Sequence, residues 1–306
     1  MIQARFEGGV RFGVDLGGSK YRIGLVNSDA ELIGDSIRVS VDDITEADVL
    51  VRSICDSAAK LTNTNNISQE DVKVMGIGSP GPLNIYTGII LESLNLTYLR
   101  GYPFADKLGE MLSIEVSIGN DANCFVLGQQ IAGAAKGFQN VLGITLGTGY
   151  GCVIIVDGKL YEGSTGTAGE YGTSPYLEGV FEDYISGRGL KSIFKKLSGE
   201  ESRPFLIEDA ARKGDKNAIQ TFEEFGTHIG NSLSYIVNLL DPSIIVIGGS
   251  IANAYELFID SLKESLLSKI HGQPIKNLII KQAENGEENA LIGAAMLISS
   301  RKTNHK

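Results

Sequence analysis

The residues best suited to chemistry are Asp121 and its carboxamide neighbours in the run Asn120-Asp121-Ala122-Asn123. This run follows an apolar stretch, 114–118, that predicts a strand, and it leads into a stretch, 122–135, that predicts a helix. Open α/β sheets place their chemistry at the carboxyl ends of strands. A carboxylate there can act as a general base, and the amide of Asn120 can hydrogen-bond a polar ligand. The alternative interpretation is that Asp121 only caps the helix, as Asp and Asn commonly do.

Three glycine-rich turns follow strand-like stretches and could hold phosphate groups. They are 15–20, which reads Asp-Leu-Gly-Gly-Ser-Lys, 146–149, which reads Leu-Gly-Thr-Gly, and 247–249, which reads Ile-Gly-Gly. Backbone N–H groups in such turns bind phosphate oxygens, because glycine lets the backbone approach closely. The carboxylate of Asp15 could hold Mg²⁺ through water, and Thr148 adds a hydroxyl donor. Taken alone, each turn is also compatible with a plain hairpin.

The composition is that of a soluble globular chain without a nucleic-acid or membrane partner. A length of 306 residues favours two domains. The net charge of −10 argues against nucleic-acid binding, which needs clustered Lys and Arg, and no apolar run approaches the length of a membrane span. Cys55, Cys124 and Cys152 form no Cys-x-x-Cys pair, and the N-terminus resembles no signal peptide, so we expect a reducing cytoplasm.

The chain consists of two α/β halves that begin alike. A strand, a glycine turn and a strand occupy 11–28, and the same order returns at 140–157. This indicates a weak internal duplication, with chance similarity of two hairpins as the alternative. We expect a smaller α/β domain, 1–118 plus a C-terminal helix at about 290–306, and a larger one, 119–289, with helical insertions. The remaining predicted helices cover 44–61, 104–112, 181–197, 207–213, 218–240, 255–270 and 290–299, and the remaining strands cover 31–39, 72–77, 243–247 and 278–281.

The order of these motifs is similar to that of the actin-like ATPase and sugar kinase superfamily. Within it the chain resembles the ROK family (repressors, open reading frames, kinases), and in particular its bacterial glucokinases. The resemblance covers roughly residues 11–300, and together its motifs are highly specific. The segments that carry it are Val14–Ser19, Gly76–Gly81, Asn120–Asn123, Leu146–Gly149, Ala168–Gly172, Glu182–Gly187 and Asp241–Gly249.

The resemblance implies a fold, an activity and a set of site residues. The fold would be α/β, with two actin-like (ribonuclease H-like) domains and a cleft between them. The activity would be phosphorylation of a hexose, glucose first, at its 6-hydroxyl with ATP and Mg²⁺, by a homodimeric cytoplasmic enzyme with Asp121 as general base. Sugar contacts would come from Gly78, Ser79, Asn95, Asn120, Asp121, Glu170 and Glu182. ATP contacts would come from Asp15, Gly17, Gly18, Ser19, Thr148, Gly149, Gly248 and Gly249, with Asp15 holding Mg²⁺ through water.

The chain departs from the family pattern after Glu170. Many members carry a His after Gly-Glu-x-Gly and then a cysteine-rich zinc motif. Here Thr173 takes the place of the His, and 174–181 contains no Cys or His. Four N or S ligands cannot be assembled from this segment, so we expect no structural zinc. We expect packing by Tyr176, Leu177 and Phe181 to hold Glu182 instead, and the missing His leaves the choice of sugar open.

Three alternatives to a glucokinase remain. A kinase of the same fold could act on fructose, mannose, an N-acetylhexosamine or a β-glucoside, or could use polyphosphate as donor. A sugar-sensing transcriptional repressor of the family would carry a helix-turn-helix segment before the first phosphate turn, whereas Asp15 stands near the start of this chain. An actin-like chaperone ATPase would need large insertions, for which the chain is too short.

Overall fold

The computed structural model describes residues 9–93, 96–272 and 274–302 of the chain, which form two compact units. The first unit comprises the described residues up to Gly137 together with those from Glu284 onward, and the second runs from Phe138 to Ala283. These bounds differ from the expected division after residue 118 and at about residue 290. The difference arises because the helix that begins at Asp121 packs within the first unit, against the C-terminal helix.

The first unit is built on a five-stranded sheet in the order β3-β2-β1-β4-β7. Strands β1 (Val10–Leu16), β2 (Lys20–Val26) and β3 (Leu32–Ser40) form an antiparallel meander. Strands β4 (Val72–Ser79) and β7 (Glu115–Asn120) then continue the sheet parallel to β1. The carboxyl ends of the three parallel strands therefore meet at one edge of this sheet.

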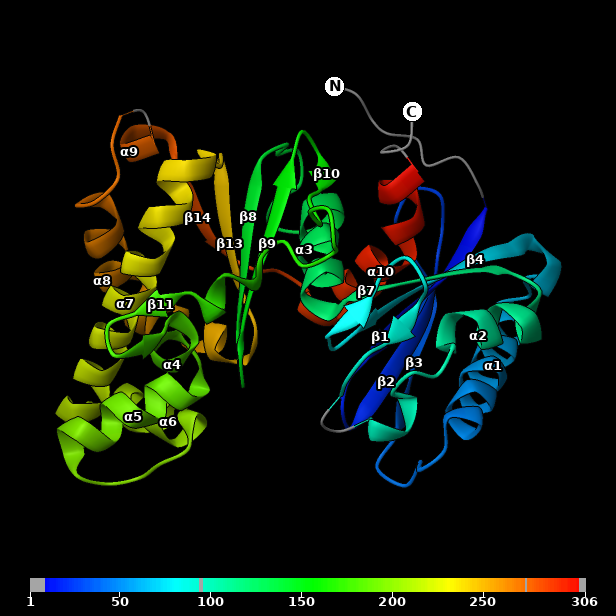
Figure 1. Ribbon diagram of the computed structural model, residues 1–306, viewed down its shortest axis with the longest axis horizontal. Helices are drawn as coiled ribbons and strands as arrows, with labels where there is room; N and C mark the ends of the chain where they lie inside the picture. The colour runs from blue at the N-terminus through cyan, green and yellow to red at the C-terminus, as the bar shows by residue number, and fades with distance from the viewer. Residues whose placement is uncertain (1–8, 94–95, 273, 303–306) are drawn as a thin grey trace. The chain divides into compact units, whose positions relative to one another are not determined.

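Alternation along the strands separates the two faces of the first sheet. Phe12 and Val14 are buried in a cluster that also contains Leu50 and Ile54 of α1 (Ala47–Thr64). The helix α2 (Phe104–Leu112) contributes to the same cluster. The residues that alternate with Phe12 and Val14 along β1 point to the opposite face of the sheet. That face is covered by α3 (Asp121–Ala132) and α10 (Gly286–Lys302), which lie side by side in Figure 1.

Glycines allow α10 to pack almost backbone to backbone against the sheet and α3. A Cβ added at Gly76 of β4 would lie 1.7 Å from the carbonyl oxygen of Ala294 in α10. A Cβ added at Gly128 of α3 would lie 1.7 Å from the carbonyl oxygen of Asn289. No side chain fits into such a space, so these two contacts require glycine. The C-terminal helix is thereby seated on both the sheet and α3.

The second unit repeats the strand arrangement of the first. Its sheet has the order β10-β9-β8-β13-β14, with β8 (Val141–Leu146) and β9 (Tyr150–Val156) antiparallel. Strands β13 (Ile244–Gly248) and β14 (Ile279–Gln282) add to β8 in parallel, and β10 (Lys159–Leu160) pairs with β9 at the edge. Each sheet therefore consists of three antiparallel strands followed by two strands that are parallel to the third. The expected internal duplication therefore has a counterpart in the topology.

Helices make up most of the remaining second unit, and α7 (Lys216–Leu240) packs along α8 (Tyr255–Leu267) in Figure 1. The expected helix 181–197 is wrong as one element, because it is broken at Ser186, whose φ of −118° and ψ of 180° are extended. The helices are α4 (Phe181–Ile185), α5 (Gly187–Ser198), α6 (Pro204–Arg212), α7 (Lys216–Leu240), α8 (Tyr255–Leu267) and α9 (Pro274–Asn277). Two-residue strands form two small hairpins, β5 (Leu83–Asn84) with β6 (Ile89–Ile90) and β11 (Pro175–Tyr176) with β12 (Gly179–Val180). In the described ranges no helix has both the length and the hydropathy needed to cross a bilayer.

We predict that Gly128→Ala destabilises the protein strongly, because the added methyl group would collide with the α10 backbone at Asn289. The expected loss in the free energy of unfolding is about 3 kcal/mol, measured by urea denaturation. Gly137→Ala is the matched control: its φ is +90° but nothing lies within 4 Å of the added atom, so backbone strain alone costs about 1 kcal/mol. Equal losses in the two variants would contradict the close-packing interpretation.

Candidate functional site

The ends of the three parallel strands in the first unit bring four of the predicted site residues together. Asp15 of β1 lies in register with Gly78 of β4, and Ser79 of β4 lies in register with Asn120 of β7. Asp121 follows directly as the first residue of α3. The strand ends that were expected to carry chemistry thus form one edge of the sheet. The carboxylates of Asp15 and Asp121 lie on either side of it, and the buried hydroxyl of Ser79 lies on the strand between them.

The first turn of α3 shows which residue caps the helix. The side chain of Asn120 is the N-cap and accepts a hydrogen bond from the N–H of Ala122 at 2.9 Å. Asp121 Oδ1 accepts from the same N–H at 2.8 Å. Asn120 occupies the N-cap position and already satisfies this N–H, so the bond from Ala122 to Asp121 is not needed as a cap, which weakens the interpretation of Asp121 as a cap only. Burial raises the pKa of Asp121, and the backbone N–H groups around it lower that pKa in part.

Asp15 shares this environment. Its pKa is raised to about 6, first by burial and then by the negative charge of Asp121, while Arg22 and Lys20 oppose the rise. Arg22 stands directly opposite Asp15 on β2 and forms an ion pair of 2.6 Å with Glu287 at the start of α10. The half-buried carboxylates of Asp15 and Asp121 are close enough to interact electrostatically, so the electrostatic potential around them is negative. Such a pair fits a divalent cation held by oxygen ligands, so Mg²⁺ suits these residues.

The first glycine turn closes the hairpin between β1 and β2. The N–H of Gly17 donates to the carbonyl of Lys20 at 2.8 Å, so this group serves the turn itself. Gly18 and Ser19 lie at the tip, and Ser19 is exposed. The hairpin interpretation is therefore right as local structure. A hairpin turn beside Asp15 still leaves its tip available to an anion.

The second and third glycine turns lie against each other in the second unit. The N–H of Gly147 donates to the carbonyl of Gly149 at 3.0 Å, which closes the turn between β8 and β9. Gly249, just past β13, has a φ of +89°, and a Cβ there would lie 2.3 Å from the carbonyl oxygen of Leu146. Only glycine fits both conditions. Two of the three predicted phosphate turns therefore form one continuous backbone surface.

Glu182 adjoins the second glycine turn, whereas Glu170 lies on the surface. Glu182 Oε2 accepts a hydrogen bond from the N–H of Tyr150 at 3.0 Å, next to Gly149. Glu170 is exposed and begins a short 3₁₀ turn, Glu170–Thr173. The hydroxyl of Thr173 donates to the Glu170 carbonyl at 2.8 Å, so Thr173 helps to close this turn. The predicted residue Asn95 lies outside the described residues.

An aromatic cluster occupies the segment where relatives of the resembled family carry their zinc motif. Phe181 stacks on Tyr176, with ring centroids 4.3 Å apart, and on Tyr171 at 4.9 Å. The Tyr176 hydroxyl hydrogen-bonds Nδ1 of His228 at 2.9 Å and accepts from Asn231 at 2.9 Å. We therefore find the expected packing for Tyr176 and Phe181, one residue before Glu182. Stacked and edge-to-face rings with satisfied hydroxyl groups make a rigid support.

Leu177 does not take part in this packing, which corrects the expectation. Its side chain is 68% exposed, and its φ of +49° marks the tip of the β11–β12 hairpin. His228 packs against Tyr176 and Tyr184 instead of standing at the surface, and burial lowers its pKa. Within the described ranges, no group of three or more His, Cys, Asp or Glu side chains could hold a metal ion.

Residues that sequence reasoning missed surround the two predicted sites. Arg22 and Glu287 face Asp15, and the alternation of β1 and β2 across the hairpin was the signal that could have placed Arg22 there. Gly187 donates its N–H to the carbonyl of Gly147 at 2.8 Å, so the start of α5 belongs to the second glycine turn. The apolar spacing of the sequence did not predict this contact, because the contact depends on the break between α4 and α5 at Ser186.

A statistical model of the ROK family matches residues 11–301 of the chain. Among characterised proteins, the glucokinase of Thermotoga maritima is 28% identical over 94% of this chain and 97% of its own length. The N-acetylgalactosamine kinase AgaK of Shewanella sp. is 29% identical over 94% of this chain and 96% of its own. The N-acetyl-D-glucosamine kinase of Aliivibrio salmonicida is 29% identical over 94% and 98%, respectively.

Solved structures share the fold over nearly the whole chain. The ROK family glucokinase from Streptomyces griseus, in complex with glucose and AMPPNP, superimposes with a TM-score of 0.76 at 28% identity. The match covers 94% of this chain and 99% of that one. The ROK hexokinase from Thermus thermophilus gives a TM-score of 0.81 at 24% identity, covering 94% and 97%. The expected α/β fold, with two five-stranded sheets as in actin-like sugar kinases, is thereby confirmed.

We predict that the aromatic cluster, and no metal, holds the segment before Glu182. Phe181→Ala should lower the free energy of unfolding by about 3 kcal/mol, because it removes a buried ring and two stacking contacts. Leu177→Ala, in the same hairpin but exposed, should change it by less than about 0.5 kcal/mol. A chelator should leave the melting temperature of the wild type unchanged. Stoichiometric zinc in the purified protein, or melting that a chelator lowers, would overturn this assignment.

Proposed function

The chain belongs to the ROK family and is a sugar kinase, and we propose that it transfers the terminal phosphoryl group of ATP to the 6-hydroxyl of a hexose, glucose first. The observation that carries this proposal is the register of β1, β4 and β7, which gathers Asp15, Ser79 and Asn120 beside Asp121 at one sheet edge. Phosphoryl transfer needs positioning, charge stabilisation and a carboxylate that takes the hydroxyl proton.

The relatives favour glucose or an N-acetylhexosamine as the sugar. The glucokinase of Thermotoga maritima and the N-acetylhexosamine kinases are similar to this chain to nearly the same degree. Fructose, mannose and a β-glucoside remain alternatives. Thr173, whose hydroxyl bonds the carbonyl of Glu170, stands where many members have a sugar-contacting His. The environment of the sugar therefore differs here from the common pattern.

Asp121 is the proposed general base. Burial raises the pKa of Asp121, which makes its carboxylate a stronger base than that of an ordinary aspartate. Asn120, Gly78 and Ser79 line the same sheet edge and would orient the sugar. Glu170 and Glu182 would accept hydrogen bonds from sugar hydroxyl groups, as would Asn95. Once a bound sugar covers these acceptors, a sugar that lacks the matching hydroxyl group would leave them unpaired, which would discriminate between sugars.

Asp15 would hold Mg²⁺ through water. When bound there, the ion would supply positive charge that stabilises the negative charge on the phosphates of ATP. Asp15 suits this role because its carboxylate is half-buried near Asp121 and faces a network of Arg22 and Glu287 that fixes its surroundings. The phosphates themselves would contact Gly17, Gly18 and Ser19 in the first unit and Thr148 and Gly149 in the second. Gly248 and Gly249 would border the adenosine.

Two further expectations accompany this function. Cys55, Cys124 and Cys152 form no disulfide, which fits a reducing cytoplasm. The family resemblance implies a homodimer, and light scattering of the purified protein measures that directly.

We predict that the protein forms a sugar phosphate only when ATP and a suitable hexose are both present. A coupled assay of ADP release over a sugar panel should show turnover with glucose or an N-acetylhexosamine well above the rate with ATP alone. Mass spectrometry of the product should place one added phosphoryl group on the sugar. Binding of a sugar without turnover on any member of the panel would favour a sugar sensor and contradict the kinase.

Asp121→Asn should lower kcat about 10²–10⁴-fold, because the variant keeps the shape of the site but cannot take the proton. The KM for the sugar should change little. For the wild type, kcat/KM should fall as the pH decreases through the pKa of Asp121. Because that pKa is raised, the fall in kcat/KM should occur at a pH above the ordinary value of 3.8. Asp106→Asn is the matched control, because Asp106 is an exposed acid in the first turn of α2. Near-normal turnover of Asp121→Asn would remove Asp121 as the base.

A further inference from the structure

The carboxylate of Glu182 is held at both of its oxygens by groups of the second unit. Oε2 accepts a hydrogen bond from the N–H of Tyr150 at 3.0 Å, and Oε1 pairs with the guanidinium group of Arg188 at 3.5 Å. The side chain of Glu182 is nevertheless 36% exposed. A carboxylate can accept about four hydrogen bonds, so its capacity is not exhausted by these two partners and is available to the hydroxyl groups of a sugar.

The partner of Oε2 belongs to the second glycine turn. Tyr150 begins β9 directly after Gly149, and a Cβ added at Gly149 would lie 3.0 Å from Oε2 of Glu182. The other end of the turn is held from the same region, because the N–H of Gly187 donates to the carbonyl of Gly147 at 2.8 Å. The junction between α4 and α5 therefore contacts both ends of the turn that is proposed to hold phosphate.

Arg188 joins the two helices at this junction. It is the second residue of α5, and its guanidinium group pairs with two neighbouring carboxylates of α4, Asp183 at 2.9 Å and Glu182 at 3.5 Å. Asp183 in turn accepts the N–H of Val180 at 3.1 Å and closes the first turn of α4. One arginine thus ties the start of α5 to the residue that touches the glycine turn.

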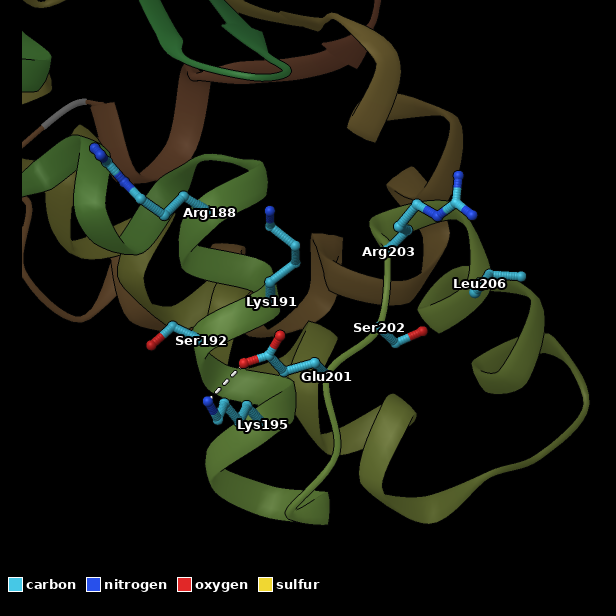
Figure 2. A pocket seen from close by; sticks show the side chains of 8 residues that line it. All are labelled: Arg188, Lys191, Ser192, Lys195, Glu201, Ser202, Arg203 and Leu206. Carbon is cyan, nitrogen blue, oxygen red and sulfur yellow. Dashed lines mark hydrogen bonds and ion pairs between the residues drawn. The ribbon is translucent and has the colours of Figure 1, made fainter.

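The direction of the Arg188 side chain differs from that of the neighbouring cations. Arg188 borders a hollow between α5 and α6 together with Lys191, Lys195 and Arg203. Figure 2 shows Lys195 turned toward Glu201, with which it pairs at 2.6 Å, whereas Arg188 extends away from both. The charge of Arg188 is therefore directed to the carboxylates of α4 and not into the hollow.

The pairs made by Arg188 serve orientation more than stability. Its side chain is 63% exposed, and exposed ion pairs contribute little to the free energy of unfolding. A carboxylate that is held at both oxygens keeps one orientation, so a ligand binds it without first having to order it. Removal of Arg188 should therefore leave the fold intact and change how Glu182 is presented.

We propose that Glu182 links the bound sugar to the phosphate turn 146–149, and that Arg188 is the positioning residue that holds Glu182 in place for both. The inference rests on the proposed kinase function, which makes Glu182 a sugar acceptor and 146–149 a phosphate turn. A sugar that orders the carboxylate also orders the N–H of Tyr150 and the turn before it. ATP then meets a turn that is already ordered, so each substrate tightens the binding of the other by the same factor.

Two double-mutant cycles test the role of Arg188 by calorimetric titration with glucose and with N-acetylglucosamine. Arg188→Ala should weaken binding of the tighter-binding sugar about fivefold, through the loss of one ion pair. The same substitution should have no further effect in a Glu182→Gln variant, because the carboxylate on which Arg188 acts is then absent. In an Asp183→Asn variant it should still weaken sugar binding about fivefold, because Glu182 is intact.

A second measurement uses AMPPNP, a non-hydrolysable analogue of ATP. Saturating sugar should tighten AMPPNP binding to the wild type about fivefold or more, and to Arg188→Ala by less than about twofold. Arg188→Lys, which keeps the positive charge, should restore part of both effects. Arg212→Ala is the matched control, because Arg212 is also an exposed arginine, on α6, with Glu208 and Glu256 as its partners. It should leave the sugar affinity and the coupling within about 1.5-fold of wild type.

Several outcomes would overturn the inference. Additive losses from Arg188→Ala and Glu182→Gln would show that Arg188 does not act through Glu182. An effect of Arg188→Ala that vanishes in the Asp183→Asn variant would assign the arginine to the capping of α4. Coupling that persists in Arg188→Ala, or that falls equally in Arg212→Ala, would remove the link to the phosphate turn.

These titrations need no turnover, so failure of the inference and failure of the kinase function are distinguishable. A wild type that binds sugar and shows the expected cycles without forming a sugar phosphate would contradict the kinase function alone. A wild type that phosphorylates a sugar but shows additive cycles would contradict the inference alone. Binding of neither sugar to the wild type would overturn both.

Discussion

The arrangement of the first unit depends on the contact of α10 with the sheet and α3, made almost without side chains. Gly13 and Gly76 of the sheet and Gly128 of α3 face the backbone of α10, and Gly293 of α10 faces the carbonyl of Cys124 in turn. Glycine at both surfaces lets two helices and a sheet approach more closely than any other residue permits. The contact joins the end of the chain to its beginning, and it explains why the compact unit extends to Gly137 before the chain leaves it.

That contact also determines the electrostatics of the site. Seating α3 on the sheet places Asp121 beside Gly78, at the level of Asp15, and seating α10 brings Glu287 to Arg22. Burial raises the pKa of both carboxyl groups, and the negative charge of Asp121 adds to the rise at Asp15, whose pKa is about 6. Charge buried in this way opposes folding and favours cation binding. The packing that stabilises the unit therefore maintains a centre that would be unfavourable without its ligands.

The sequence predicts most of this architecture, and where it does not, the reason is tertiary. Apolar periodicity and glycine turns place the strands that carry Asp15, Ser79 and Asn120, because those signals are local. The break at Ser186 is invisible to periodicity, since the apolar spacing continues through it and only the hydrogen bond from Gly187 to Gly147 explains it. The pairing of Arg22 with Glu287 joins residues from opposite ends of the chain.

The segment before Glu182 shows how a fold can retain a position while the interaction that holds it changes. A zinc ion fixes a loop through a few strong bonds of defined geometry. Here Phe181 lies between Tyr171 and Tyr176, and Tyr176 is held at its hydroxyl by His228 and Asn231 on α7. Each aromatic pair contributes only about 0.5–1.5 kcal/mol beyond its burial, so the support is distributed over several contacts and two elements. The helix α4, which presents Glu182, is therefore anchored to α7 through the aromatic rings of its neighbours.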